Sequence, residues 1–407
     1  MNTLPLILLS IVGMASNPAQ EVTYTPLPDG FDYPAKTETL LAAVKTGDVA
    51  RLREHAWLVF AGLTQPVRPA DPDSEAVWET WYSAVETFGP DAGHSARDIQ
   101  RLLKRPTQSS SIHGMGKRPD VESTSWSFTL FNEDLRRHTR GNRLQAKATM
   151  QTIDSTWTNL TPVVDRKVPE YPATAMSLKV VWWLVKKSGM TALPVWDEQQ
   201  RTIRGLAQPE LMWQRRVAVD PSRDAVPDGE IVDLSGFPHS RVVPLSAFHQ
   251  VTLDARLAAT LRGAEAGDHL VLVGMHYATK ELPDWVWATF WWHDRPADGP
   301  YAQHRPADSI LKGVWRNYLM DVAYDMDLPR ESDGTPNAVF NPWLEGRYLN
   351  GVNANCMTCH QRAVWSPATP APSFKPITRG AAQPDDPLFQ CGTKADYLWS
   401  LLLDGNQ

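Results

Sequence analysis

The pentapeptide Cys356-Met357-Thr358-Cys359-His360 constrains this chain of 407 residues more than any other segment. Two thiols separated by two residues and followed directly by a histidine form the attachment pattern of c-type haem: the thiols bond to the two haem vinyl groups, and the imidazole coordinates the iron. The surrounding chain must then fold around a rigid, planar ring system. The sequence therefore predicts one covalently bound haem c, held by Cys356 and Cys359, with His360 as an axial iron ligand.

Two other uses of a CxxC spacing fit this sequence less well. A thioredoxin-like redox pair requires a βαβ context around the motif, and no such pattern surrounds these residues. Half of a zinc site requires two further ligands at a fixed spacing. The third cysteine, Cys391, stands alone, so the sequence favours haem attachment.

All three cysteines lie in the last fifth of the chain, so no disulfide framework holds the 355 residues before them. Cys391 is most simply a buried free thiol, with metal ligation or pairing with another chain as the alternatives. The composition is that of a folded protein, with 42% hydrophobic residues. Its 17 tryptophans indicate large aromatic cores or an aromatic pocket.

The N-terminus resembles a secretory signal peptide. Residues 1–15 are an apolar run that ends in small residues, with cleavage expected after Ala15, although the first cationic side chain is Lys36. Haem attachment of this type occurs outside the cytoplasmic membrane, which agrees with export. We therefore expect a periplasmic or otherwise exported protein, with no transmembrane span beyond the N-terminal signal because no later segment approaches 18 apolar residues.

The apolar pattern changes twice along the chain. Helical spacing in the N-terminal part gives way to short runs rich in Val, Trp and Leu, of which 269–278 and 285–293 predict a hairpin. Helical spacing returns near the C-terminus. The helices expected from this spacing cover 37–60, 73–88, 132–144, 253–264, 308–326 and 394–403.

These patterns predict an α+β fold with a helical N-terminal region, a strand-rich centre and a helical, cytochrome c-like C-terminal haem segment. The expected division is a signal peptide at 1–20, a mainly helical region at 21–170, a strand-rich region at 171–304 and a haem-binding region at 305–407.

The motif makes the chain similar to the exported bacterial c-type cytochromes that carry a single haem, in which a long N-terminal region precedes a C-terminal CxxCH. The segments 274–276, 285–290 and 396–400 also look like those of large bacterial relatives without an assigned function. The resemblance implies haem binding and redox activity, with redox partner proteins or a small redox substrate as partners. Nucleic acid is not expected as a partner, because the net charge is −6.

The second axial position of the iron is the main departure from familiar small cytochromes c, in which a methionine far downstream of the motif fills it. No Met or His follows His360, so a second ligand has to come from upstream. The first candidates are His276 and His293, with Met320 on the segment before the motif. Weaker candidates are Met275, His304 and Met326, and for each of the six a structural role is the alternative.

Two classes of function follow. In the first, the protein is an electron carrier with a six-coordinate haem. In the second, it is a peroxidase- or oxidase-like enzyme in which His276 or His293 acts as a distal acid and base beside an open iron site in an aromatic pocket. Carboxylates near the hairpin could supply further acid or base groups, although solvated loop charges are the simpler interpretation of them: Glu281, Asp284 and Asp294. A haem-based sensor is a third possibility.

Overall fold

The computed structural model describes residues 23–71, 74–89, 125–158, 160–197, 209–345, 355–367, 380–382, 386, 389–390 and 392–402. The predicted signal peptide and Cys391 lie outside the described residues.

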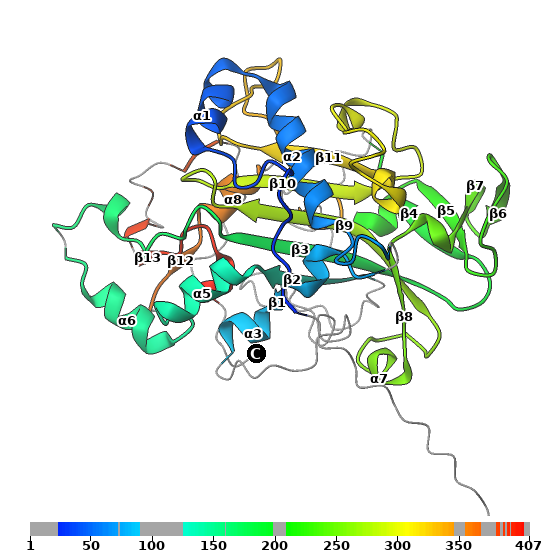
Figure 1. The fold of residues 1–407 in the computed structure, drawn as a ribbon, viewed down its shortest axis with the longest axis horizontal. Coiled ribbons are helices and arrows are strands. Elements are labelled where there is room, and N and C mark those ends of the chain that lie inside the picture. The colour runs from blue at the N-terminus through cyan, green and yellow to red at the C-terminus, as the bar shows by residue number, and fades with distance from the viewer. Residues whose placement is uncertain are drawn as a thin grey trace, which may run out of the picture.

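An antiparallel sheet of seven strands forms the centre of the protein (Figure 1). Six strands follow one another in the order β1-β2-β3-β9-β10-β11, and β8 pairs with β9 beside this path. The strands are β1 (Tyr82–Ser83), β2 (Ser125–Phe131), β3 (Met176–Val185), β8 (Gln250–Thr252), β9 (His269–Thr279), β10 (Val286–Trp292) and β11 (Tyr318–Ala323). The predicted hairpin is present as β9 and β10, which pair from Val286–Thr279 to Trp291–Gly274.

Two smaller sheets flank the central one. The first has four strands in the order β4-β5-β7-β6, with β5 and β7 parallel. The second is the pair β12-β13. Their strands are β4 (Thr191–Val195), β5 (Arg215–Asp220), β6 (Ile231–Leu234), β7 (Phe237–Pro244), β12 (Val364–Trp365) and β13 (Thr393–Lys394).

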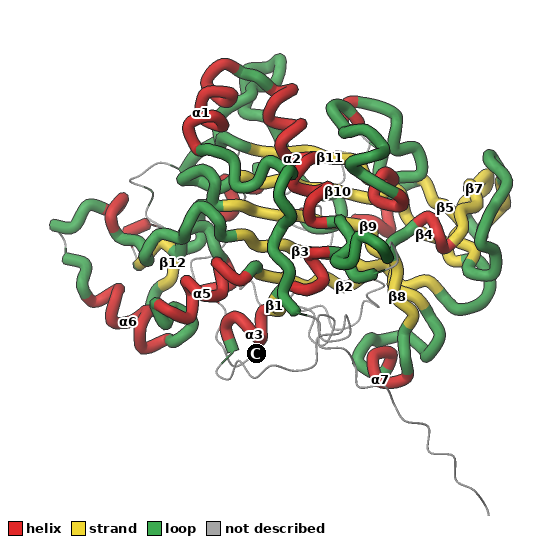
Figure 2. The backbone as a smooth tube through the Cα atoms, in the orientation of Figure 1, coloured by secondary structure: helices red, strands yellow, loops and turns green. Residues whose placement is uncertain are grey.

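The helices are short and lie around the sheets, as Figure 2 shows in red. The α-helices are α1 (Thr37–Thr46), α2 (Val49–Leu63), α3 (Ala84–Phe88), α5 (Glu133–Gly141), α6 (Lys147–Ser155), α7 (Ala255–Ala258) and α8 (Cys356–His360). The 3₁₀ turns are Val77–Thr80, Val163–Asp165, Pro209–Met212, Leu245–Ala247, Pro300–Ala302, Gly313–Asn317 and Trp399–Leu402.

The two faces of the central sheet carry different layers. Helix α2 covers one face, where the Phe60 ring stacks on Phe290 of β10 with 4.0 Å between ring centres. Because successive side chains of a strand point to opposite faces, Thr289 and Trp287 lie on the other face. On that other face Trp287 packs in one apolar cluster with Cys356 of α8. The CxxCH motif therefore lies against the face opposite α2.

Burial on both faces explains why β9 and β10 do not alternate between apolar and polar residues. Every residue of β10 is buried, as is every residue of β9 except His269. A strand covered on both faces reads as a continuous apolar run of β-branched and aromatic residues. The runs of Val and Trp in the centre of the chain are strands of this type.

The predicted fold class is wrong. The protein is rich in antiparallel strands outside the predicted centre as well, because β1 and β2 come from the part expected to be helical and β11 comes from the part expected to form a helical haem segment. The predicted helix at 308–326 is a 3₁₀ turn, Gly313–Asn317, followed by β11. The predicted helix at 394–403 is β13 and a second 3₁₀ turn, Trp399–Leu402. No cytochrome c-like helical segment appears among the described residues.

The competition for hydrogen bonds explains the wrong prediction at 308–326. The edge of β10 offers unpaired backbone groups, and β11 satisfies them from Trp287–Ala323 to Trp292–Tyr318. The same residues have apolar side chains at helical spacing, but the strand buries Tyr318 and Met320 on the sheet completely. A tertiary partner thus outweighs the local preference.

Candidate haem-binding site

The motif folds as the short helix α8, and Asn355 holds its first turn. The Asn355 side chain accepts a hydrogen bond from the Met357 backbone N–H at 3.0 Å, and its amide donates to the Asp325 carbonyl at 3.2 Å. The Thr358 hydroxyl donates to the Asn355 carbonyl at 2.8 Å. Asn355 is buried. Through its side-chain hydrogen bonds it connects the motif helix to the segment that follows β11.

This contact gives a first prediction. Replacing Asn355 with Ala removes a helix cap and leaves the Asp325 carbonyl without its donor, so we expect the free energy of unfolding to fall by about 1–2 kcal/mol. Urea denaturation measures the change. Asn142→Ala is the control, because its side chain makes one exposed hydrogen bond to the His138 carbonyl. Equal effects of the two substitutions would show that the cap does not stabilise the motif.

Both cysteines of the motif are free thiols. Cys356 is buried, and its Sγ donates to the Val339 carbonyl at 3.4 Å. Cys359 is half-buried at the other end of the helical turn. Burial raises the pKa of the Cys356 thiol well above its ordinary value and that of Cys359 to about 12, so both thiols are protonated at neutral pH.

His360 is oriented through one ring nitrogen. Its Nδ1 lies 2.8 Å from the carbonyl oxygen of Tyr397, which can only accept, so Nδ1 carries the proton. Burial lowers the pKa of His360 to about 4, and the ring is therefore neutral at pH 7. A neutral imidazole with its proton on Nδ1 presents the lone pair of Nε2. This is the form in which histidine binds a metal ion, with the second nitrogen bonded to a carbonyl.

An unusual backbone turn holds the Tyr397 carbonyl in place. Asp396 and Tyr397 both have positive φ angles, 45° and 68°, which non-glycine residues rarely adopt. The Asp396 carboxylate accepts from Lys280 Nζ at 2.7 Å and from the Tyr171 backbone N–H at 3.1 Å. The Tyr397 hydroxyl donates to Asp284 at 2.6 Å. The Trp285 Nε1 also donates to Asp396 at 3.3 Å, so four contacts fix the turn that orients His360.

A second imidazole lies beside His360. His276 comes from β9, where it is 6% exposed, and both of its ring nitrogens are buried without a hydrogen-bond partner in the part of the chain that the structure describes. Burial lowers its pKa well below the ordinary value, so this ring is also neutral. The centres of the His276 and His360 rings are 6.3 Å apart, and the ring planes differ by 28°.

His276 belongs to a row of polar side chains that crosses the sheet beneath the motif. Strand pairing places His276 opposite Lys179 on one side and Thr289 on the other. The row continues to Thr129 of β2 and Asp321 of β11. Directly opposite residues of antiparallel strands share a face, so all five side chains lie on the face of the motif.

Trp287 also contacts the two imidazoles. Its ring centre is 4.0 Å from that of His360 and 5.5 Å from that of His276. The indole therefore lies beside the line that joins the two rings. Its Nε1 donates to the Asp284 carbonyl at 3.0 Å.

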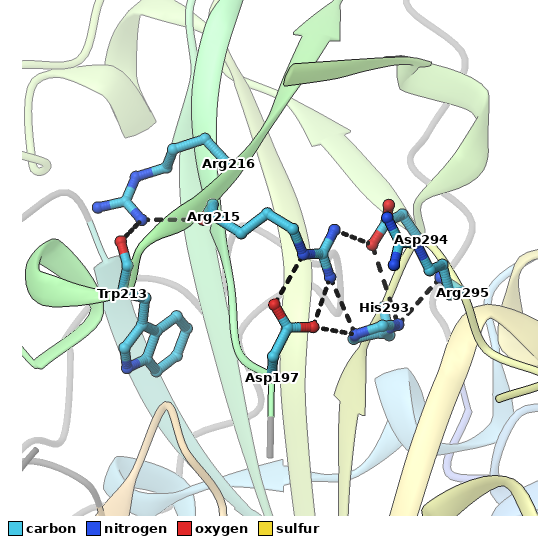
Figure 3. A network of polar contacts seen from close by, with 7 residues as sticks. All are labelled: Asp197, Trp213, Arg215, Arg216, His293, Asp294 and Arg295. Carbon is cyan, nitrogen blue, oxygen red and sulfur yellow. Dashed lines mark hydrogen bonds and ion pairs between the residues drawn. The ribbon is translucent and has the colours of Figure 1, made fainter. Parts of the chain in front are cut away.

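His293 makes its contacts with residues outside this arrangement. Figure 3 shows it in a network with Arg215 and Asp197: its Nε2 lies 3.3 Å from Asp197 Oδ1 and its Nδ1 accepts from the Arg295 backbone N–H at 2.9 Å. Arg215 also binds the buried carboxylate of Asp294 at 2.7 Å. Both nitrogens of His293 are occupied. Through Arg215 of β5, His293 links the four-stranded sheet to the end of β10.

The methionine candidates divide between the two faces. Met320 pairs with Phe290, and Phe290 in turn pairs with Met275, so both methionines lie on the face covered by α2. His304 is exposed on a loop of that side, next to Gln303, whose carbonyl accepts from Trp57 of α2. Met326 alone among the methionine candidates packs in the cluster that contains Cys356.

The three carboxylates near the hairpin have structural contacts. Glu281 is buried against His55 of α2, Asp294 pairs with Arg215, and Asp284 accepts from Tyr397. The expectation of solvated loop charges is wrong for Glu281 and Asp294, since both are buried. Only Asp284 touches the candidate site, through the turn that orients His360.

Two residues of the site, Asp396 and Tyr397, lie in the segment 396–400, which the resemblance singled out without giving it a role. The Tyr397 acceptor is a backbone carbonyl, which every residue possesses, and Asp396 acts by holding that carbonyl. A hydrogen bond from His360 across 37 residues depends on the folded chain alone.

No protein-family model, curated protein or solved structure matches this chain. Within the described ranges there is no cluster of three or more His, Cys, Asp and Glu side chains that would hold a metal ion by themselves. Within the same ranges no helix is long and apolar enough to cross a membrane. The function of the site therefore has to follow from its own geometry.

Proposed function

We propose that the protein is a c-type cytochrome that holds one haem covalently through Cys356 and Cys359, with His360 as an axial ligand, and transfers electrons in the cell envelope. The observation that carries this proposal is the orientation of His360. Its Nδ1 is engaged by the Tyr397 carbonyl at 2.8 Å, so Nε2 is the nitrogen that remains for an iron ion. Two free thiols on the same helical turn supply the groups for covalent attachment.

The residues around the motif fit a haem group in their chemistry. His276 is a buried polar side chain whose nitrogens have no partner among the described residues, and Trp287 and Met357 make the surroundings apolar. When bound, haem supplies an iron that changes between two oxidation states. The protein supplies the axial nitrogen, shields the ring from water and sets the reduction potential through burial and hydrogen bonding to His360.

The unpartnered imidazole also supports an alternative, a haem c enzyme with an open site. In that case His276 would serve as a distal acid and base, as in peroxidase-type chemistry, from a buried position with its ring centre 6.3 Å from that of His360. The two functions differ in whether a protein group or a substrate occupies the second axial position.

The test is to produce the full chain in bacteria together with a cytochrome c maturation system. We expect haem that stays on the polypeptide in denaturing electrophoresis and a mass increased by one haem. We also expect a ferrous spectrum that carbon monoxide does not change. Absence of covalent haem would contradict the proposal as a whole. Covalent haem with an immediate carbon monoxide shift would favour the enzyme and make a peroxide assay the next measurement.

A further inference from the structure

We infer that His276 is the second axial ligand of the iron, which would make the site a bis-histidine haem. This inference rests on the proposed function, because it requires a haem on Cys356 and Cys359. The inference goes beyond the proposed function because it assigns the second axial position to a residue of β9, 84 positions upstream of His360 and at the centre of the main sheet.

The first argument is the state of the His276 side chain. A buried polar group normally has a hydrogen-bond partner, and an imidazole without one is unfavourable inside a protein. Neither nitrogen of His276 has a partner in the described parts of the chain, although hydroxyl and ammonium side chains lie opposite it on the neighbouring strands. An iron ion that accepts the lone pair of one nitrogen would satisfy that nitrogen, which is the half of the deficit that a donor side chain does not meet here.

The second argument is distance. A metal–imidazole bond is about 2 Å long, and each ring centre lies roughly 1 Å beyond its nitrogen. Two imidazoles on opposite sides of one metal ion therefore have their ring centres about 6 Å apart. The observed separation of the His276 and His360 rings is 6.3 Å.

The third argument concerns the neighbouring indole. Trp287 lies next to the line between the two imidazoles, where a planar ring system bound to both would extend. Its side chain therefore has to shift when haem is attached. The indole is held in its present position by one hydrogen bond, from Nε1 to the Asp284 carbonyl at 3.0 Å, and by packing against the rings of His360 and Tyr397. The sheet itself, which positions His276, does not have to change.

The other candidates for this position are less suitable. Met320 and Met275 lie on the opposite face of the sheet, and both nitrogens of His293 are already bonded. Met326 is on the correct face, packed in the cluster that contains Cys356. It is the natural comparison for His276 in an experiment.

The experiment uses haem-loaded full-length protein and three variants: His276→Ala, His276→Met and Met326→Leu. We expect the wild type and Met326→Leu to be low-spin and unreactive with carbon monoxide in the ferrous state. His276→Ala should become high-spin and bind carbon monoxide stoichiometrically, and added imidazole should restore the low-spin spectrum. His276→Met should stay low-spin with a higher reduction potential, since methionine ligation raises the potential.

A measurement on the wild type avoids dependence on the folding of the variants. Near-infrared magnetic circular dichroism distinguishes histidine–histidine from histidine–methionine ligation, and we expect the former. A low-spin, carbon monoxide-insensitive His276→Ala protein would overturn the inference. So would a wild-type spectrum with methionine ligation or with an open position. In each of these cases covalent haem would still be present, so haem attachment at the motif would stand, although an open position would favour the enzyme over the electron carrier. A chain without covalent haem would overturn both the inference and the proposed function.

Discussion

A variant with Cys356→Ser and Cys359→Ser is expected to lose all haem that survives denaturing electrophoresis. Hydroxyl groups do not add to the vinyl groups of haem, so both covalent bonds disappear together. The fold should persist, because serine is close to cysteine in size and the hydroxyl at 356 can still donate to the Val339 carbonyl that the Cys356 thiol now contacts at 3.4 Å. Haem staining measures the loss, and circular dichroism checks the fold.

Cys391→Ser is the matched control, because it removes the remaining cysteine of the chain and leaves the pentapeptide intact. It should retain full haem staining. Staining of the double variant at the wild-type level would show that the motif is not the attachment point. Loss of staining in Cys391→Ser would show that the third cysteine takes part.

The second large effect is expected in the core, on the face of the sheet opposite the motif. Glu281→Ala should lower the free energy of unfolding by about 3–5 kcal/mol, because it leaves buried partners unpaired. The Glu281 carboxylate accepts from the Ala35 backbone N–H at 2.7 Å and from the Thr279 hydroxyl at 2.5 Å, and it lies 3.1 Å from His55 Nε2. The side chains of His55 and Glu281 are both fully buried.

The structural role of this cluster is to attach the N-terminal helices to the loop between β9 and β10. His55 Nδ1 lies 2.7 Å from the Tyr324 hydroxyl, which donates to the Leu52 carbonyl of α2 at 2.7 Å. Removing the Glu281 carboxylate therefore weakens the contacts to Ala35, just before α1, and to His55 of α2 at once. Urea denaturation of the apoprotein measures the change.

The control is an exposed ion pair. Glu265 lies 3.1 Å from Lys187 Nζ, with exposed side-chain fractions of 64% and 48%. Solvent screens such a pair, so Glu265→Ala should cost about 1 kcal/mol or less. If Glu281→Ala were as mild as Glu265→Ala, the buried cluster would not contribute to stability as its contacts suggest.

The order of the strands in the sheet bears on how the candidate site is formed. His276 and Trp287 come from adjacent strands of one hairpin, whereas His360 is oriented by a turn at 396–397. Asp396 links this turn to the hairpin through Lys280, which lies just after β9. The rigid hairpin therefore supports both imidazoles, one directly and the other through the Asp396 carboxylate.

The sequence alone determined the local chemistry. The CxxCH spacing identified His360 and the two thiols, and runs of Val and Trp identified β9 and β10 because buried strands are continuous apolar segments. Helical spacing also located α1 and α2, although as one predicted helix; Gly47, with φ of 67°, ends α1 and separates them.

Only the tertiary structure decided which segments join the sheet and which candidate imidazole approaches the motif. Residues 318–323 became β11 because the edge of β10 supplied hydrogen-bond partners that a local pattern does not record. His276 and His293 are equivalent in the sequence, each a histidine on an apolar strand. They differ in what the fold brings to them: Arg215 and Asp197 bond to His293, while His276 lies near His360 and has no partner within the described ranges. Contacts between residues distant in the chain depend on strand pairing and packing, so no local property of either histidine predicts them.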